Sequence, residues 1–224
     1  MKNVKPAFIS DNYKQKVLFI IVAVIGVALT GFGIAFNSAA ALGNDAVAIL
    51  YDGIRTACGL SIDKLGVVTN IVNVTVFIIV LILSRKYINI GTFIYTLPMG
   101  LFVSVGSKIY AAVIPSDTIP CRIVGAVLGC MMLFIGIGTF IAADIGFDPF
   151  TGVVMIIKDK IKSQYRTAKI MSDVISITVG FLLGGMAGPV TVVAAFAGGP
   201  VIQKSSEVVK SIINKLMRTD SVRN

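Results

Sequence analysis

The amino-acid sequence predicts an all-α membrane protein of about six transmembrane helices, arranged as a 3+3 inverted-topology repeat with two short interfacial or partly inserted helices. The first observation behind this prediction is the composition. Of 224 residues, 56% are hydrophobic and only 14% are charged, and the mean hydropathy is +0.91, far above the range of soluble domains. The second observation is the length of the apolar stretches, and the third is a unit of sequence that occurs twice.

Six apolar stretches account for the predicted transmembrane helices. A helix needs roughly 20 residues to cross a hydrocarbon layer of about 30 Å, and four stretches reach that length. Two further stretches are shorter and are interrupted by "LLGGMAGP" and "AGGPV". The four long stretches are residues 17–42, 65–84, 91–114 and 121–143, and the two shorter ones are residues 170–185 and 189–204.

The repeated unit begins with two glycines and small apolar residues and continues to an aspartate. It occurs as "GFGIAFNSAAALGNDAVAIL" and again as "GIGTFIAADIGFDPFTGV". A second match follows in each unit, in "GTFIYTLPMG" and "VTVVAAFAGGP", where a proline lies close to a glycine. Because each unit holds three spans, an odd number, the second copy enters the membrane from the opposite side. The aligned pairs are Gly31 and Gly33 with Gly136 and Gly138, Asp45 with Asp148, Thr92 with Thr191, and Gly100 with Gly199, and a proline lies close to each of the last two glycines, Pro98 before Gly100 and Pro200 after Gly199.

Basic residues divide unequally between the two predicted sides of the membrane. Sixteen of the 20 Lys and Arg residues lie in the segments 1–16, 85–90, 145–170 and 204–224, and the other four are Arg55, Lys64, Lys108 and Arg122. The positive-inside rule then places both termini in the cytoplasm, and we expect a multi-pass protein of the bacterial inner membrane. The predicted division is a cytoplasmic N-terminal segment (1–16), a first three-span repeat (17–114), a second three-span repeat (115–204) and a basic amphipathic cytoplasmic tail (205–224).

The sequence argues against an enzyme. It contains no histidine, the commonest general base and metal ligand, and no phosphate-binding loop, nucleophile elbow or dinucleotide fingerprint. Cys58, Cys121 and Cys130 have no metal-binding spacing, so we expect no metal site and no cofactor. A disulfide between Cys58 and Cys121, on the same predicted side, is a minor alternative. The net charge of +9 indicates anionic lipids at the cytoplasmic face rather than nucleic acid.

The two aligned aspartates are the leading candidates for substrate or ion binding. Asp148 precedes Pro149, which is a strong helix start, and each acid is followed by a stretch too short or too charged to span, "AVAILYDGIRTACGL" or "PFTGVVMIIKDKIKSQ". Capping a short helix is therefore one interpretation of Asp45 and Asp148. The other is that carboxylates near a membrane cavity bind a proton, a cation or an amine.

Polar residues and predicted helix breaks complete the candidate site. Asn70 and Asn73 share one helical face, where they contact substrate or form interhelical hydrogen bonds. Lys169 and Asp173, four residues apart, are expected to form a surface ion pair. Breaks at the paired glycines and prolines must line a cavity or be repaired by neighbours. The predicted binding residues are Asp45, Asp148, Asn70, Asn73, Thr92 and Thr191, and the predicted helix-break residues are Pro98, Gly100, Gly199 and Pro200.

Several motifs resemble the bacterial YczE/YyaS/YitT group of small integral membrane proteins. They are "ALGNDAVAILYDGI", "INIGTFIYTLPMG", "DIGFDPFTGV" and "FLLGGMAGPVTVVAAFAGGP", and the resemblance covers roughly residues 25–203. It implies a multi-spanning protein and is compatible with transport, without a settled substrate. The chain departs from the expected pattern in "GND" at residues 43–45, which lacks the proline of "FDP".

Two function classes follow from these patterns. The preferred one is a small secondary transporter of a cation, an amine or a proton-coupled solute that works by alternating access. The alternative is a non-transporting accessory or regulatory membrane protein that acts through a partner. In that case the tail "EVVKSIINKLM" would dock, through an apolar stripe that could equally lie on the inner leaflet. The stripe consists of Val208, Val209, Ile212, Ile213 and Leu216. A homo-oligomer is compatible with either class.

Overall fold

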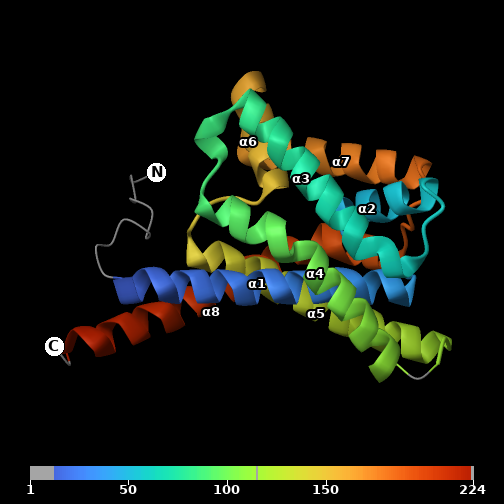
Figure 1. Cartoon of the computed structure of the whole chain (residues 1–224), viewed down its shortest axis with the longest axis horizontal. Helices are drawn as coiled ribbons and strands as arrows, with labels where there is room; N and C mark the ends of the chain where they lie inside the picture. Colours follow the sequence, from blue (N-terminus) through green and yellow to red (C-terminus); the bar gives the residue numbers. More distant parts are fainter. Residues whose placement is uncertain (1–12, 115, 223–224) are drawn as a thin grey trace.

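The computed structural model describes residues 13–114 and 116–222, and these residues form helices without any strand, so the all-α class is confirmed (Figure 1). Two of the helices, η2 and η3, are single 3₁₀ turns. The elements are α1 (Tyr13–Ala40), α2 (Ala46–Ala57), η2 (Ile62–Lys64), α3 (Leu65–Leu83), η3 (Arg85–Tyr87), α4 (Ile90–Val113), α5 (Ile119–Ala143), α6 (Pro149–Ile161), α7 (Tyr165–Leu182) and α8 (Pro189–Val222).

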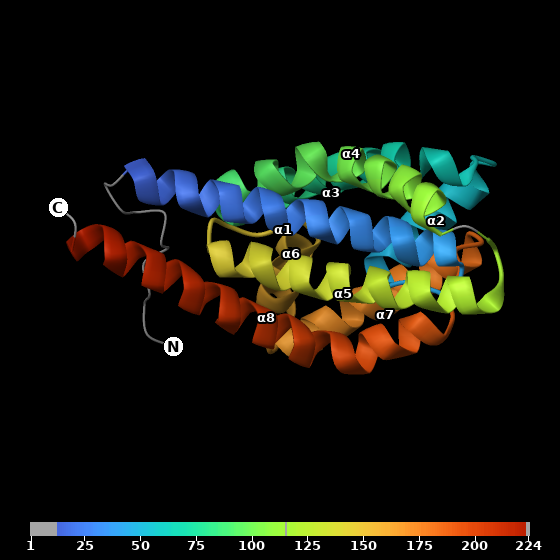
Figure 2. The same ribbon diagram turned by 90° about the horizontal axis from the view of Figure 1, so that it is seen from below.

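The helices lie in two layers (Figures 1 and 2). The first layer holds α1, α4, α5 and α8, in which α1 packs on α5 and α4, and α5 packs on α8. The second layer holds α2, α3, α6 and α7, in which α2 and α6 each pack on α3 and α7. The layers are joined where α3 packs on α4, whereas the corresponding pair, α7 and α8, forms no comparably extensive contact. Each half of the chain thus contributes two helices to each layer.

Four helices of the described chain are long and apolar enough to cross a membrane. They occupy Gln15–Ala40, Ile62–Leu83, Ile90–Val113 and Ile119–Ala143, which confirms the four long predicted stretches. The two shorter predicted stretches fall largely within α7 and α8, but neither of these helices belongs to the four. Six crossings therefore remain a prediction. In Figure 1, α1, α4 and α7 run in one direction and α3, α5 and α8 in the other, so α1 begins and α8 ends at the same end of the molecule.

Glycines allow α1 and α5 to cross in close contact. A Cβ atom on Gly33 would lie 2.4 Å from the Leu133 nitrogen and 2.7 Å from the Gly129 oxygen. A Cβ atom on Gly136 would lie 2.4 Å from the Thr30 nitrogen and 2.8 Å from the Gly26 oxygen. The two sets of contacts are equivalent under an offset of 103 residues, which relates Gly33 to Gly136 and Gly26 to Gly129. The same offset of 103 relates Asp45 to Asp148, whereas the predicted alignment of Gly33 with Gly138 uses an offset of 105.

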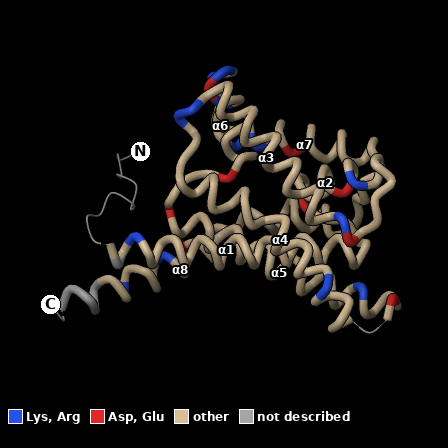
Figure 3. Tube along the Cα trace, in the orientation of Figure 1, with Lys and Arg blue, Asp and Glu red and all other residues tan. Residues whose placement is uncertain are grey.

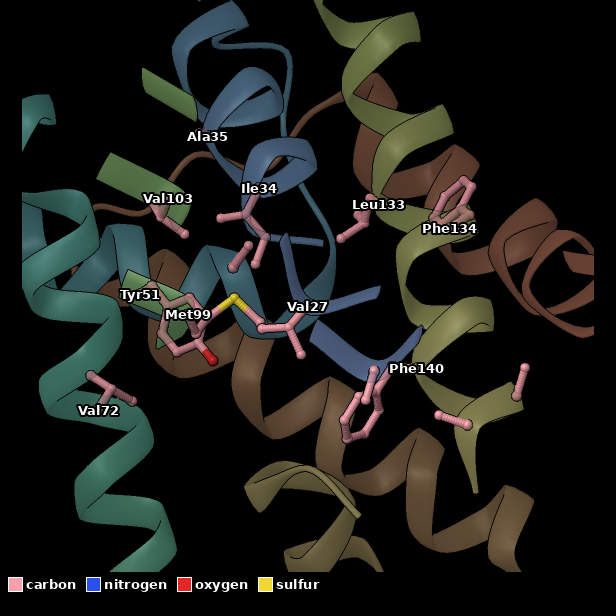
Figure 4. Packing of buried hydrophobic residues seen from close by; sticks show 14 of the residues in the cluster. Val27, Ile34, Ala35, Tyr51, Val72, Met99, Val103, Leu133, Phe134 and Phe140 are labelled. Atoms are coloured by element: carbon pink, nitrogen blue, oxygen red, sulfur yellow. The ribbon is translucent and has the colours of Figure 1, made fainter. Parts of the chain in front are cut away.

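The main hydrophobic core lies where the two layers meet (Figure 4). Val27, Ile34 and Leu133 come from the crossing of α1 and α5, and Met99 comes from α4. Tyr51, on α2, reaches the same cluster from the second layer and is 1% exposed. Because lipid tails are as apolar as these side chains, close van der Waals packing within the cluster, rather than a hydrophobic driving force, contributes to holding the layers together.

The two short helices begin in the interior and end at the surface. Helix α2 has 12 residues and α6 has 13, or about 18–20 Å at 1.5 Å per residue, too short to span a bilayer. In α2 the early residues Ala48 and Ile49 are fully buried, while Thr56 and Ala57 are exposed. In α6, Pro149 is buried and Lys160 is exposed. The predicted short helices are thus present, with their starts buried in the bundle and their ends exposed.

The loops that precede α2 and α6 have the same backbone shape. Ala41 and Asp144, 103 residues apart, both have positive φ angles, of 52° and 49°. Gly43 and Gly146, also 103 residues apart, have φ angles of 99° and 139°, which favour glycine because a Cβ atom is disfavoured there. Each loop therefore makes the same reversal, from the end of a long helix back into the bundle.

The predicted helix breaks at residues 92–100 and 191–200 are absent. Helix α4 continues through Pro98, and α8 continues through Pro200 and across the predicted boundary at residue 204. The interruption in the second half lies instead at residues 183–188, between α7 and α8. Proline inside a helix removes one backbone hydrogen bond, and neighbouring groups can satisfy the freed atoms.

The amphipathic stripe predicted for the tail is divided between two faces of α8. Ile213 is 3% exposed and packs in the main core with Val209. Val208, Ile212 and Leu216 are each about half exposed, at 49%, 52% and 50%. The C-terminal part of α8 therefore packs one face against the main core and leaves the other face exposed. The expected N-terminal segment, residues 1–16, lies mostly outside the described residues.

Charged residues gather towards the ends of the bundle and on α6, and the middle of α1 and α5 carries none (Figure 3). All three cysteines are free thiols, so the minor alternative of a Cys58–Cys121 disulfide is not found. Cys58 is exposed after the end of α2, and Lys160 is exposed near the end of α6.

Thiol labelling will test which face is cytoplasmic. In a protein that keeps only Cys58, a membrane-impermeant maleimide should label intact cells, because the predicted topology places Cys58 outside. A single cysteine at Lys160, in a background without the native cysteines, should react only after the cells are permeabilised. The opposite pattern would reverse the predicted orientation.

Candidate functional site

Asp45 begins α2 as its N-cap. Its Oδ2 accepts a hydrogen bond of 3.3 Å from the Val47 N–H, and its backbone N–H donates to the Asn44 side chain at 3.0 Å. Its Oδ1 is buried without a hydrogen-bond partner in the described structure. Asp45 lies in the connection between α1 and α2, and burial raises the pKa of its carboxyl above the ordinary value, although the nearby Lys169 acts in the opposite direction. Asp45 therefore caps α2, as one of the two interpretations predicted, but the cap uses only one carboxylate oxygen.

Asp148 begins α6 in the same way. Its Oδ1 accepts a hydrogen bond of 3.0 Å from the Thr151 N–H, and its Oδ2 accepts one from the Thr151 hydroxyl. Pro149 follows as the first residue of the helix, where a missing N–H costs nothing. Both oxygens of Asp148 are therefore engaged locally, which distinguishes it from Asp45.

Tyr51 connects the two helix starts. Its ring lies 5.9 Å from the ring of Phe150, the second residue of α6, in an edge-to-face arrangement. Burial raises the pKa of the Tyr51 phenol, and the carboxylates of Asp45 and Asp148 both add to this effect. The phenol donates a hydrogen bond of 3.1 Å to Asn73 Oδ1. The interior starts of α2 and α6 thus lie close to one tyrosine.

Asn73 is fully buried on α3. Besides accepting from Tyr51, it donates to the Thr69 carbonyl at 2.9 Å. Its hydrogen bonds are therefore interhelical and local, which is the structural alternative predicted for the asparagines. Lys169 and Asp173 form the predicted ion pair on α7.

Thr92 and Thr191 occupy equivalent positions at the starts of α4 and α8. Thr92 Oγ1 accepts a hydrogen bond of 3.1 Å from the Asn89 N–H, and Thr191 Oγ1 accepts one of 3.1 Å from the Gly188 N–H. They are capping residues and do not reach the two aspartates through any hydrogen bond among the described residues. The two threonines, which the sequence aligns, nevertheless have the same structural role.

The start of each of these helices meets the loop of the other half. The Gly91 N–H, at the start of α4, donates to the Ile145 carbonyl at 3.1 Å, and the Val190 N–H, at the start of α8, donates to the Leu42 carbonyl at 3.0 Å. Leu42 and Ile145 are 103 residues apart. The two halves therefore exchange equivalent backbone contacts, one near each end of the bundle.

Asn70 satisfies the backbone of α4 just after Pro98. Its side-chain amide donates to the Leu97 carbonyl at 3.2 Å and accepts from the Gly100 N–H at 2.9 Å. A Cβ atom on Gly100 would lie 2.1 Å from the Gly66 oxygen, so glycine is required for this approach. In the second half, a Cβ atom on Gly199 would have no atom within 4 Å. Of the two predicted helix-break glycines, only Gly100 therefore makes a close interhelical contact.

An outer cavity of about 780 Å³ lies between the layers, at the end of the bundle where α1 ends and α5 begins. It is lined by parts of α1, α2, η2 and α4, and by Met186. None of the six predicted binding residues lines it, but Gly43 and Asn44, next to Asp45, do. The cavity therefore approaches the start of α2 from the side that the charge distribution predicts to be outside.

Sequence reasoning missed several residues of this region. Tyr51 could have been found from its place on the short helix that Asp45 begins, between Leu50 and Asp52. Arg122 donates hydrogen bonds of 2.7 Å to the Ala40 and Ala41 carbonyls and so caps α1. No local signal identifies these partners, because more than 80 residues separate them from Arg122.

Together, the two-layered helical fold and the four apolar helices define the class, an all-α membrane protein. Residues 17–207 match the family described as "Family of unknown function (DUF6198)", and the chain belongs to this family. An uncharacterized protein of Haemophilus influenzae is 24% identical over 116 residues, which are 52% of this chain and 52% of that protein. The chain thus matches about half the length of this relative. No solved structure matches the chain. The resemblance to the YczE/YyaS/YitT group is not contradicted and remains a prediction.

Proposed function

We propose that the protein is a small secondary transporter of the bacterial inner membrane, with six spans in a 3+3 inverted repeat and both termini in the cytoplasm. The order of long and short helices in the two halves supports the repeat, as do the paired φ angles and the exchanged backbone contacts. A two-fold relation in the membrane plane allows one packing to exist in inward-open and outward-open forms of similar energy.

The start of α2 is the observation that carries this proposal. A half-buried carboxylate with one unpartnered buried oxygen lies at the interior end of a partly inserted helix. Such a group binds a proton readily, because burial favours its neutral form, and intramembrane ionisable residues commonly serve ion pathways. Asp148 at the equivalent place supplies a second carboxylate. Two acids suit a cation, an amine or a proton-coupled solute better than an anion.

The two ends of the bundle differ in a way that supports alternating access. At the predicted cytoplasmic end, Asp159 of α6 binds both Lys86, at 2.5 Å, and the Tyr87 hydroxyl of η3. At the predicted outer end lies the outer cavity. Under this proposal the structure represents an outward-facing form, in which α6 is bound through Asp159 to η3, between α3 and α4.

Proton flux in liposomes that contain the purified protein will test the proposal. A gradient of sodium, potassium or ethylamine should drive proton movement, reported by an internal pH dye. The variants Asp45→Asn and Asp148→Asn should abolish the coupled flux while the protein stays folded, because asparagine caps a helix about as well as aspartate but cannot ionise. Asp148→Ala, in contrast, should also lower the stability by about 1 kcal/mol.

The dependence of the free energy of unfolding on pH provides a control for the protonation state of the Asp45 carboxyl. The raised folded-state pKa means that the wild-type protein loses stability as the pH rises from the ordinary value of 3.8 through the raised value. Asp45→Asn should lack this loss in thermal melts. Normal proton-coupled flux in both asparagine variants would contradict the proposal and leave the acids as helix caps.

The exposed face of α8 favours the second candidate, an accessory protein that acts through a partner. Val208, Ile212 and Leu216 form an apolar line on a helix that extends past the end of α5 (Figure 2). If this candidate is correct, the purified wild-type protein should show no coupled flux in liposomes, and replacing all three residues with serine should abolish the cellular function while the protein stays folded.

A further inference from the structure

The outer cavity has the size and the lining of a binding site for a small solute. Its volume of about 780 Å³ falls within the range of roughly 300–1,000 Å³ that is usual for small-molecule pockets. Its buried polar groups are the amides of Asn37 and Asn44, which are 0% and 3% exposed. Ile49 and Tyr110 add apolar surface. The lining also includes five charged residues, and their partners decide which ligand charge the cavity can accept.

Three of these charged residues already have partners. Asp52 and Arg55 form an ion pair at 2.8 Å, and Asp52 Oδ2 also accepts a hydrogen bond of 3.2 Å from the Met186 N–H. Arg55 uses its remaining donors on Thr56 and on the Leu60 carbonyl. Asp117 is 90% exposed and lies 3.9 Å from Arg122. None of the three therefore offers an uncompensated charge to a solute inside the cavity.

The remaining two residues have opposite charges. Lys108, on α4, forms no hydrogen bond or ion pair with any residue of the described chain, and it is exposed. Asp63, on η2, accepts a single hydrogen bond of 3.3 Å from the Ser61 hydroxyl and has no basic partner among the described residues. Lys108 lies on α4 and Asp63 on η2, which packs against α4, and both residues are exposed lining residues of the same cavity.

We infer that the outer cavity binds a small zwitterion, with its carboxylate at Lys108 and its ammonium group at Asp63. This inference rests on the proposed function and deepens it, because it assigns the substrate class. An amine alone would leave Lys108 without a counter-ion, and an acid alone would leave Asp63 without one. The phenyl face of Tyr110 is a further contact for an ammonium group. From this cavity the route to Asp45 passes Asn44, whose side chain accepts the Asp45 N–H.

Equilibrium binding to the purified full-length protein will test the inference. The probes are glycine, L-serine, L-leucine and glycine betaine, with ethylamine and acetate as the singly charged analogues. At least one zwitterion should raise the melting temperature, and neither analogue should do so at the same concentration. Lys108→Met and Asp63→Asn should each weaken that binding by about tenfold or more, as expected for loss of a hydrogen bond to a charged group. Lys64→Met, an exposed change next to Asp63 that does not line the cavity, should leave it unchanged.

Each result separates this inference from the proposed function. Lack of stabilisation by all four zwitterions, equal stabilisation by ethylamine or acetate, or unchanged binding in the Lys108→Met protein would overturn the inference. Proton-coupled flux of a simple cation without zwitterion binding would overturn it and leave the transporter proposal intact. Zwitterion binding without any flux would support the site and contradict transport.

Discussion

Replacing Gly33 with valine is expected to abolish the folded protein. The added Cβ atom would meet backbone atoms of α5 at 2.4 and 2.7 Å, and backbone cannot move aside as a flexible side chain can. Overpacking usually costs about 1–3 kcal/mol and occasionally more, and we expect this change to exceed that range because α1 and α5 form the most extensive contact of the first layer. Gly136→Val, at the paired position, should have the same effect. Size-exclusion chromatography and thermal melting in detergent will measure both.

Gly199→Val is the matched control for these variants. It places the same side chain on a helix of the same layer, but a Cβ atom there has no atom within 4 Å. The sequence aligned Gly199 with Gly100 as helix-break residues, but only Gly100 lies in close contact with another helix. If Gly33→Val elutes and melts like Gly199→Val, the close crossing of α1 and α5 is wrong.

Replacing Asn70 with leucine should produce the second large effect. Leucine has a similar volume, but it would leave the Leu97 carbonyl and the Gly100 N–H without the partner that Asn70 provides. An unsatisfied polar group costs about 1–3 kcal/mol, and in a bilayer no water replaces the lost bond. We expect a lower melting temperature and faster hydrogen exchange at the Gly100 amide.

Thr75→Val provides the comparison on the same helix. The Thr75 hydroxyl donates only to the Ile71 carbonyl of its own helix, at 2.8 Å, so its loss leaves the interface with α4 unchanged. Asn70→Leu should melt well below Thr75→Val. Equal melting temperatures would show that the contact between α3 and α4 does not depend on Asn70.

Features that depend on neighbouring residues could be predicted from the sequence. The four long apolar stretches correspond to helices because hydropathy over 20 residues decides whether a segment can cross a bilayer. The starts of α2 and α6 were also predictable, because an Asp followed by a short helical stretch caps it locally. The equivalence of Thr92 and Thr191, at the starts of α4 and α8, could be predicted because each lies at the same distance in sequence from a glycine, Gly100 or Gly199.

Features that depend on distant partners could not be predicted. Proline and glycine in α4 predict a break, but the helix continues through Pro98, and Asn70, about 30 residues earlier, hydrogen-bonds its backbone at Leu97 and Gly100. The outer cavity gathers residues from α1, α2, η2 and α4, and its paired and unpaired charges depend on that arrangement. The unpartnered oxygen of Asp45 is likewise a property of the folded chain.

The unequal attachment of the two layers has a mechanical consequence. Helix α3 is fastened to α4 through Asn70 and the close approach of Gly66 and Gly100, whereas α7 has no comparable contact with α8. We therefore expect the edge formed by α3 and α4 to act as a pivot, because the opposite edge, between α7 and α8, has few contacts along the helices. In such a motion the second layer rotates about the contact between α3 and α4. The space that opens beside α8 would then be filled by lipid tails rather than by protein.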